Sequence, residues 1–82
     1  MKVFADFNAP TLAPAFPDDI PEYGSIKTAL RAFERFVENQ SRYTEASECT
    51  GYLYFGHPGA CSNYPDRVLT VGPRGGVRIS RG

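Results

Sequence analysis

Apolar and polar residues alternate along residues 2–7, at the start of the chain. Val3, Ala5 and Phe7 fall on one side of this pattern, and Phe4 falls on the other. A period of two residues is typical of a strand that turns one face toward a core. The pattern therefore predicts a first β-strand over residues 2–7.

The next segment, residues 8–24, is rich in proline and holds four of the seven prolines of the chain. Proline cannot donate a ladder hydrogen bond, so we expect an extended or turn-rich crossing segment rather than a regular strand. Leu12, Phe16 and Ile20 recur along it at spacings of four. The segment can therefore lay apolar groups onto a sheet or a helix.

A helical pattern follows Ser25, which is a favourable N-cap residue. Its apolar positions share one helical face and are Ile26, Ala29, Leu30, Phe33, Phe36 and Val37. The other face is charged, and it holds Lys27, Arg31, Glu34, Arg35 and Glu38. A solvated face, with Arg31–Glu34 and Arg35–Glu38 able to pair across one turn, is the simplest interpretation. The helix should end between residues 39 and 44, and residues 41–48 are its last turn or a loop.

Three more strands are predicted in the second half of the chain. Residues 49–55 alternate again, and residues 56–66 are a loop by composition. Residues 67–80 read as a β-hairpin, because the segment 72–76 is rich enough in glycine to reverse the chain. Pairing Val71 with Val77 places Leu69 opposite Ile79 and Arg67 opposite Arg81.

These elements predict one α+β domain over residues 1–82, in the order β-α-β-β-β, with the helix across one face of a mostly antiparallel sheet. The covered face should carry Val3, Ala5, Phe7, Leu53, Phe55, Leu69, Val71, Val77 and Ile79. The second face collects Phe4, Tyr52, Tyr54, Val68, Thr70 and Arg78. Either this second face is exposed, or the apolar residues of the crossing segment cover it as ordinary core.

Composition restricts the class of protein. The chain has 82 residues, 41% apolar, with nine basic and nine acidic side chains. That is material for one core, and no apolar run approaches the ~20 residues that span a bilayer. Asp6 stands where a signal peptide would hold its apolar stretch, so we expect a soluble protein in the reducing cytoplasm. Residues 1–24 carry one base and four acids, and residues 49–82 carry four bases and one acid, so the two ends can attract each other.

Cys49, His57 and Cys61 are the only cluster of metal-ligand types. Structural zinc sites usually begin with two ligands two to four residues apart, and a lone cysteine on a strand lacks that geometry. The simpler interpretation is that Cys49 is buried and inert. Cys49 and Cys61 should both be free thiols, because the expected compartment disfavours a disulfide. We therefore predict no metal site and no cofactor.

An enzyme is the poorer class for this chain. A single histidine in a loop, with no nucleophile motif, provides no catalytic residues that the sequence can name. The adjacent Asp18 and Asp19 are the only paired carboxylates, and their side chains diverge in an extended segment. The glycine-rich segment 72–76 lacks the following helix and lysine of a phosphate-binding loop, so the turn interpretation is preferred.

A small binding protein is the leading hypothesis. Aromatic residues beside arginine on a sheet face are enriched in protein interfaces, and Tyr52, Tyr54, Arg74 and Arg78 are the candidate partner-binding residues. The charged face of the helix is the other surface through which the protein could engage a partner. The alternative is nucleic-acid binding through the C-terminal arginines with the two tyrosines stacking on bases. Neutral net charge and the acidic residues at 18–22 oppose that alternative.

The ending from Tyr64 to Ile79, with its run Gly72-Pro73-Arg74-Gly75-Gly76, resembles the ending of small proteins encoded by actinobacteriophages. The bias of seven arginines to two lysines is compatible with a high-GC genome of that kind. This resemblance supplies no catalytic residues. It implies the cytoplasm of an infected bacterium and a small product that binds and modulates a host protein.

Two further expectations concern the sheet edges. An unpaired edge at the first or the last strand makes a homo-oligomer possible. The like charges of Arg67 and Arg81, placed opposite each other by the hairpin register, need compensation. Divergence into solvent, an internal carboxylate or an anionic group on a partner could each provide it. We favour an internal carboxylate, either Asp66 or an acidic residue of the proline-rich segment, because the first third of the chain is net acidic.

Overall fold

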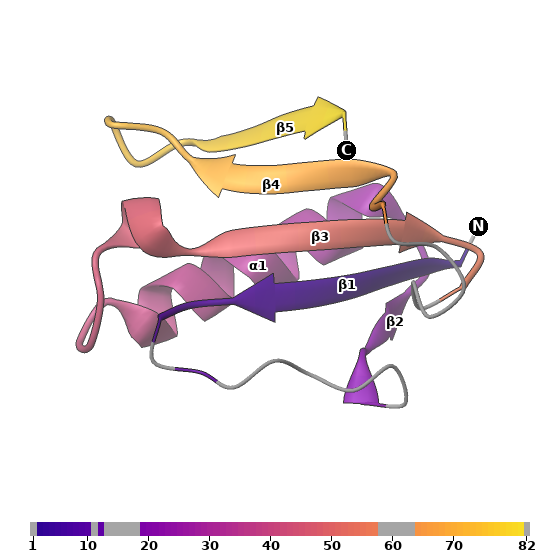
Figure 1. Ribbon diagram of the computed structural model, residues 1–82, viewed down its shortest axis with the longest axis horizontal. Coiled ribbons are helices and arrows are strands. Elements are labelled where there is room, and N and C mark those ends of the chain that lie inside the picture. Colours follow the sequence, from indigo (N-terminus) through magenta and orange to yellow (C-terminus); the bar gives the residue numbers. More distant parts are fainter. Residues whose placement is uncertain (1, 11, 13–18, 58–63, 82) are drawn as a thin grey trace.

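The computed structural model describes residues 2–10, 12, 19–57 and 64–81. Its elements are the strands β1 (Val3–Asn8), β2 (Glu22–Tyr23), β3 (Thr50–Phe55), β4 (Arg67–Val71) and β5 (Val77–Arg81), the helix α1 (Ile26–Gln40) and the short 3-10 helix η2 (Ala46–Glu48). The fold is a small α+β domain, as predicted. Figure 1 shows the sheet in front, with α1 running obliquely behind β3 and β1.

All neighbouring strands are antiparallel, in the spatial order β2-β1-β3-β4-β5. The predicted order lacked β2, which lies inside the crossing segment at residues 8–24. There Tyr23 pairs with Val3 and Glu22 with Phe4, and the Ala5 N–H donates to the Pro21 carbonyl at 3.1 Å. The crossing segment was expected to form no strand pairing, and this was wrong for its last residues. Proline lacks only the backbone N–H, so the carbonyl of Pro21 can still accept a hydrogen bond.

The helix begins and ends near the residues that the sequence indicated. The Ser25 hydroxyl caps it by accepting a hydrogen bond of 3.2 Å from the Thr28 N–H. At its other end Ser41 donates twice to the Glu38 carbonyl, through its N–H and its hydroxyl. Residues 41–48, for which turn and loop both remained open, form turns followed by η2.

The core lies between α1 and the sheet. Phe33 is fully buried, and its ring centre lies 5.4 Å from that of Phe7. The ring centre of Phe36 lies 5.5 Å from that of Phe7. Gly51 makes this packing possible, because a Cβ there would approach Phe33 Cδ1 to 3.1 Å and Leu69 Cβ to 3.2 Å. In the described part of the chain, the hydrophobic residues with no exposed surface are Val3, Ala5, Ala29, Phe33, Cys49, Leu53 and Leu69.

The C-terminal hairpin has the predicted register. Val71 pairs with Val77, Leu69 with Ile79 and Arg67 with Arg81. Gly75 occupies the left-handed region at φ 86° in the turn, which favours glycine. One prediction for this hairpin was wrong: Ile79 lies on the helix side of the sheet but is 46% exposed, because β5 is the outer strand and α1 packs behind β1 and β3.

No helix in the described part of the chain is long and apolar enough to span a membrane.

Candidate functional site

The sheet face opposite α1 is here called the open face, because no described helix or strand packs on it, and it carries the predicted partner-binding tyrosines. Phe16 of the crossing segment, which was expected as a possible cover, lies outside the described residues. On β1 and β3, Phe4 stands directly opposite Tyr54, and Asp6 opposite Tyr52. Tyr52 in turn pairs with Val68 on β4. The alternation of each strand thus places these side chains in one cluster on the same face, which extends from Tyr52 to Phe4 and Tyr54 near one end of the sheet.

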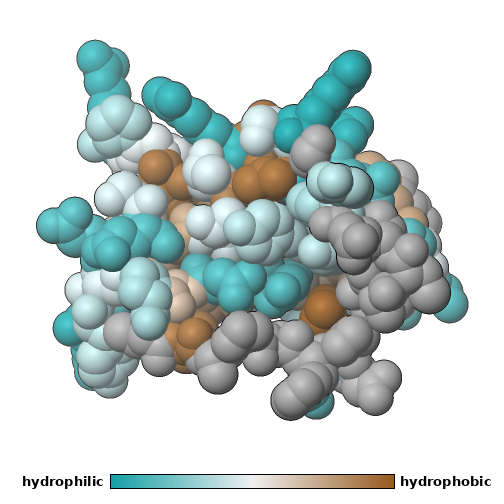
Figure 2. All heavy atoms as spheres, viewed as in Figure 1, coloured by the Kyte–Doolittle hydropathy of each residue, from teal (hydrophilic) through white to brown (hydrophobic). Residues whose placement is uncertain are grey.

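The side chains of this cluster are neither fully buried nor fully exposed. Phe4, Tyr52, Tyr54 and Val68 are all partly buried, whereas every fully buried strand residue points toward α1. Figure 2 views the molecule from this side and shows mainly pale and hydrophilic residues over the centre of the sheet, with small separate hydrophobic patches around them. The open face therefore offers aromatic surface within a polar frame, the composition that protein interfaces share.

The Tyr54 hydroxyl group has an altered acidity. Partial burial raises its pKa above the ordinary value of 10.0, and the negative charge of Asp6 and the neighbouring Tyr52 add to the effect. The ring of Tyr54 also lies 6.4 Å from that of His57. The Tyr54 hydroxyl group therefore stays neutral to a higher pH than that of an exposed tyrosine, and a neutral hydroxyl group can donate and accept hydrogen bonds.

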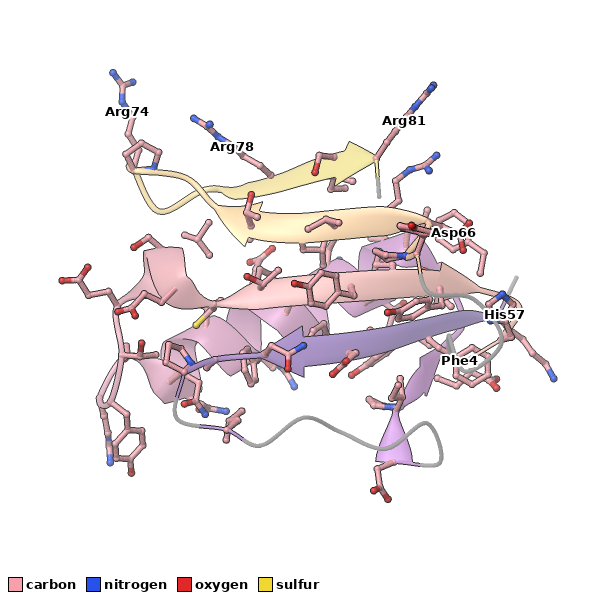
Figure 3. The ribbon with its side chains drawn as sticks, in the orientation of Figure 1. Phe4, His57, Asp66, Arg74, Arg78 and Arg81 are labelled. Carbon is pink, nitrogen blue, oxygen red and sulfur yellow. The ribbon has the colours of Figure 1, made fainter. Side chains whose placement is uncertain are left out.

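The predicted arginines divide between the two sides of the sheet. Arg78 pairs with Thr70 and shares the open face with the tyrosines, while Arg74 lies at the hairpin tip. Arg67 and Arg81 lie on the helix side. Figure 3 shows Arg74, Arg78 and Arg81 projecting outward along the β5 edge. The hairpin thus presents Arg78 to the open face, Arg74 at its tip and Arg81 near the end of β5.

The like-charge pair in the hairpin is not compensated by a carboxylate among the described residues. Arg67 Nη1 donates to the Asp66 carbonyl, at 2.6 Å, and the guanidinium carbon lies 5.5 Å from the centre of the Phe55 ring. The Asp66 carboxylate is engaged elsewhere and accepts the Phe55 N–H at 2.8 Å. Asp66 therefore does not lie between Arg67 and Arg81 as expected, and an aromatic ring and a carbonyl hold Arg67 instead. Asp18 of the proline-rich segment lies outside the described residues.

The cysteine and histidine considered as metal ligands lie at opposite ends of β3. Cys49 precedes the strand and is fully buried, while His57 follows its far end. A strand advances about 3.3 Å per residue, which separates the two backbones by roughly 25 Å. One ion cannot contact both. Burial, with the adjacent Glu48 charge, also raises the pKa of the Cys49 thiol, as befits an inert core residue. Cys61 lies outside the described residues.

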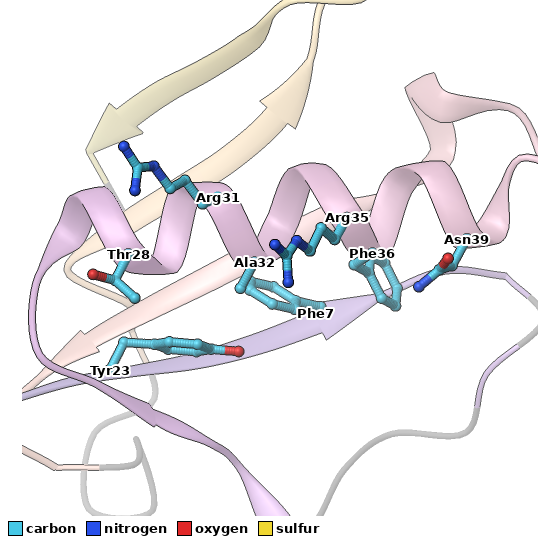
Figure 4. Close-up of a pocket in the computed structure, with 8 residues that line it drawn as sticks. All are labelled: Phe7, Tyr23, Thr28, Arg31, Ala32, Arg35, Phe36 and Asn39. Atoms are coloured by element: carbon cyan, nitrogen blue, oxygen red, sulfur yellow. The ribbon is translucent and has the colours of Figure 1, made fainter.

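A groove of about 480 Å³ runs between α1 and the edge formed by β1 and β2 (Figure 4). Phe7 and Tyr23 from the strands form its apolar floor with Phe36 from the helix, and Arg31 and Arg35 stand on its helix side. Neither arginine forms an ion pair within the described residues, so the predicted pairs with Glu34 and Glu38 are absent. Sequence reasoning missed this groove, because its floor combines residues from three separate elements.

Family models, curated proteins and solved structures provide no match to this chain.

Proposed function

We propose that the protein is a small, non-enzymatic binding protein that engages another protein through the open face of its sheet. The observation that carries the proposal is the partly buried cluster of Phe4, Tyr52 and Tyr54, which lies on the face opposite α1. Aromatic side chains with a polar tip contribute large contact area and a hydrogen bond at little entropic cost, and they dominate the energy of many interfaces.

The resemblance of the C-terminal hairpin to small actinobacteriophage proteins suggests the setting for this proposal. In that setting the partner is a host protein in the bacterial cytoplasm, and binding modulates it. Nucleic-acid binding is less well supported by the arrangement of charge. Arg78 shares the open face with the tyrosines, but Arg67 and Arg81 lie on the other side, so stacking and phosphate contacts would not converge on one surface.

The test compares three immobilised forms of the protein in bacterial lysate, with quantitative recovery of bound proteins. The first is wild type and the second carries Tyr52→Ser with Tyr54→Ser. The third carries Tyr43→Ser, which removes a 70% exposed tyrosine outside the sheet and serves as the matched control. We expect a specific protein to be recovered by the wild type and the control and lost with the double variant. Equal recovery by all three forms would exclude the open face.

Salt dependence separates this function from the alternative. An interface dominated by aromatic contacts should bind nearly as well at moderate as at low ionic strength. Binding that weakens steeply with salt, together with recovery of nucleic acid, would instead support the phosphate-directed alternative.

A further inference from the structure

The backbone N–H and C=O groups along the outer edge of β5 alternate in direction. In the hairpin the Gly72 N–H donates to the Gly76 carbonyl at 2.7 Å. Because backbone groups alternate in direction along an antiparallel strand, Arg78 and Ser80 face β4 in the same way as Gly76. The N–H and C=O groups of Val77, Ile79 and Arg81 therefore point away from the sheet.

This edge is unpaired in the part of the chain that the structure describes. β5 is the last strand of the sheet order, and none of the described segments lies beyond it. Natural edge strands are usually protected by proline, a bulge, charged side chains or a covering element. The charges on β5 are all basic, so they repel another basic strand but attract an acidic one. Here the residues from Val77 to Arg81 form a regular strand, in which only Val77 is partly buried and the rest are exposed. Its backbone groups are therefore available to pair with another strand.

The side chains around the edge define the chemistry of what could pair there. Residues 67–81 contain four arginines and no acidic residue. Three of these, Arg74, Arg78 and Arg81, are exposed and project outward along the edge (Figure 3), and none forms an ion pair with a described carboxylate. On the helix side, Ile79 adds an apolar surface that is 46% exposed. The edge is thus cationic with one apolar position.

We propose that the outer edge of β5 binds an extended acidic segment of another protein, which adds to the sheet as a further strand. Backbone hydrogen bonds to Val77, Ile79 and Arg81 would hold the added strand. Its acidic side chains would lie beside Arg78 on the open face and beside Arg81 on the helix side. An apolar side chain of the segment would contact Ile79.

Charge distinguishes this occupant from a second copy of the chain. Two β5 edges paired with each other would bring six exposed arginines, Arg74, Arg78 and Arg81 from each copy, along one seam without a carboxylate from either hairpin. An acidic strand neutralises the same side chains. A nucleic acid could meet the arginines, but it has no alternating N–H and C=O groups to pair with the strand.

This inference concerns the edge of the sheet and not its open face, so it can succeed or fail independently of the Tyr52 and Tyr54 variants. Its test uses the full chain and a capped peptide that contains Glu-Thr-Val-Glu, which in an antiparallel pairing places glutamates opposite Arg81 and Arg78 and valine opposite Ile79. Amide hydrogen exchange, measured by NMR with and without the peptide, is the readout. We expect the peptide to protect the amides of Val77, Ile79 and Arg81, whereas those of Arg78 and Ser80 are already protected by β4.

Two variants and two control peptides make the result specific. Arg78→Gln with Arg81→Gln should weaken peptide binding about tenfold, as expected for the loss of two exposed charge contacts. Ile79→Pro should abolish the protection, because it removes an outward N–H without removing a bond to β4. Arg31→Gln with Arg35→Gln, on the helix, should leave binding unchanged. The same peptide with methylated backbone amides, or with lysine in place of glutamate, should not bind.

Three outcomes would overturn the proposal. The first is peptide binding without protection of the three outward amides. The second is protection of those amides in the free protein together with a dimer in light scattering, which would assign the edge to a second copy. The third is equal binding of the acidic and the lysine peptide. The proposal would also be overturned by an oligonucleotide that shifts the NMR signals of the arginines more than the acidic peptide does and does not protect the three outward amides.

Discussion

The guanidinium of Arg67 lies over the ring of Phe55, with 5.5 Å between the guanidinium carbon and the ring centre. The two residues are diagonal neighbours on the helix side of β3 and β4, since Arg67 pairs with Leu53. A cation above an aromatic face is attracted by the ring quadrupole. This contact explains how the hairpin tolerates Arg81 directly opposite Arg67.

The first prediction separates the two arginines of that pair. Arg67→Gln should lower the free energy of unfolding by about 0.5–1 kcal/mol, because it removes the contact with Phe55. Arg81→Gln should raise the free energy of unfolding by a few tenths of a kcal/mol, since it removes a like charge opposite Arg67. Urea unfolding at low salt measures both. Equal losses for the two variants would mean that the Phe55 contact does not distinguish them.

The second prediction concerns Asp66, which joins the start of β4 to β3. Its N–H donates to the Leu53 carbonyl, and its carboxylate accepts the Phe55 N–H, each at 2.8 Å. Asp66→Ala should cost about 1–3 kcal/mol, because the Phe55 N–H loses a charged acceptor in a partly buried position. Asp66→Asn keeps an acceptor oxygen and should cost less. Faster hydrogen exchange at the Phe55 amide in the alanine variant would identify the bond, and unchanged exchange would contradict it.

The third prediction tests the contact between α1 and the sheet at Gly51. Gly51→Ala should destabilise the protein by about 1–3 kcal/mol, because the added methyl group meets Phe33 and Leu69. Gly24→Ala is the matched control, since a Cβ there has no atom within 4 Å and should change little. Combining Gly51→Ala with Phe33→Leu should give a smaller loss than the sum of the two single changes. Strict additivity would show that the two residues are not in contact.

The fourth prediction concerns alkaline pH. Burial raises the pKa of the Cys49 thiol above 9.0 and those of the Tyr23 and Tyr54 hydroxyls above 10.0. When pH passes these ordinary values, the unfolded chain loses protons that the folded protein still holds. The free energy of unfolding should therefore be constant near neutral pH and fall as pH rises above about 9. Denaturant titrations across this range measure the fall.

Cys49→Ala provides the control for the lower part of that pH range. It should remove the part of the decline that begins near pH 9 and leave the part that begins near pH 10, which belongs to the tyrosines. A decline that starts at the same pH with the same slope in both proteins would mean that Cys49 does not contribute.

The sequence predicts the helix and the C-terminal hairpin well because their signals are local. Ser25 and the apolar spacing define α1, and the glycine-rich turn sets the pairing of Val71 with Val77. β2 was missed because two residues after Pro21 carry no periodic pattern. Their strand conformation depends on the edge of β1, which is distant in sequence.

The candidate site was predicted in part for the same reason. Alternation alone places Tyr52 and Tyr54 on one face, and the structure adds Phe4 opposite Tyr54. The contacts of Asp66 and Arg67 could not be predicted, because they depend on the register of β4 against β3, which no local sequence signal fixes. The groove beside α1 likewise depends on how close Phe7, Tyr23 and Phe36 come in three dimensions.

The strand order has a consequence for how the chain assembles. β3, β4 and β5 are consecutive in sequence and adjacent in space, whereas β1 pairs with β3 across the whole of α1. Closing that long loop carries an entropic cost before any pairing occurs, so we expect the C-terminal strands to form first. On the ribosome, β1 emerges early but must wait for β3 to be made. We therefore expect this domain to fold after its C-terminal third has been synthesised, and not while its first residues are being made.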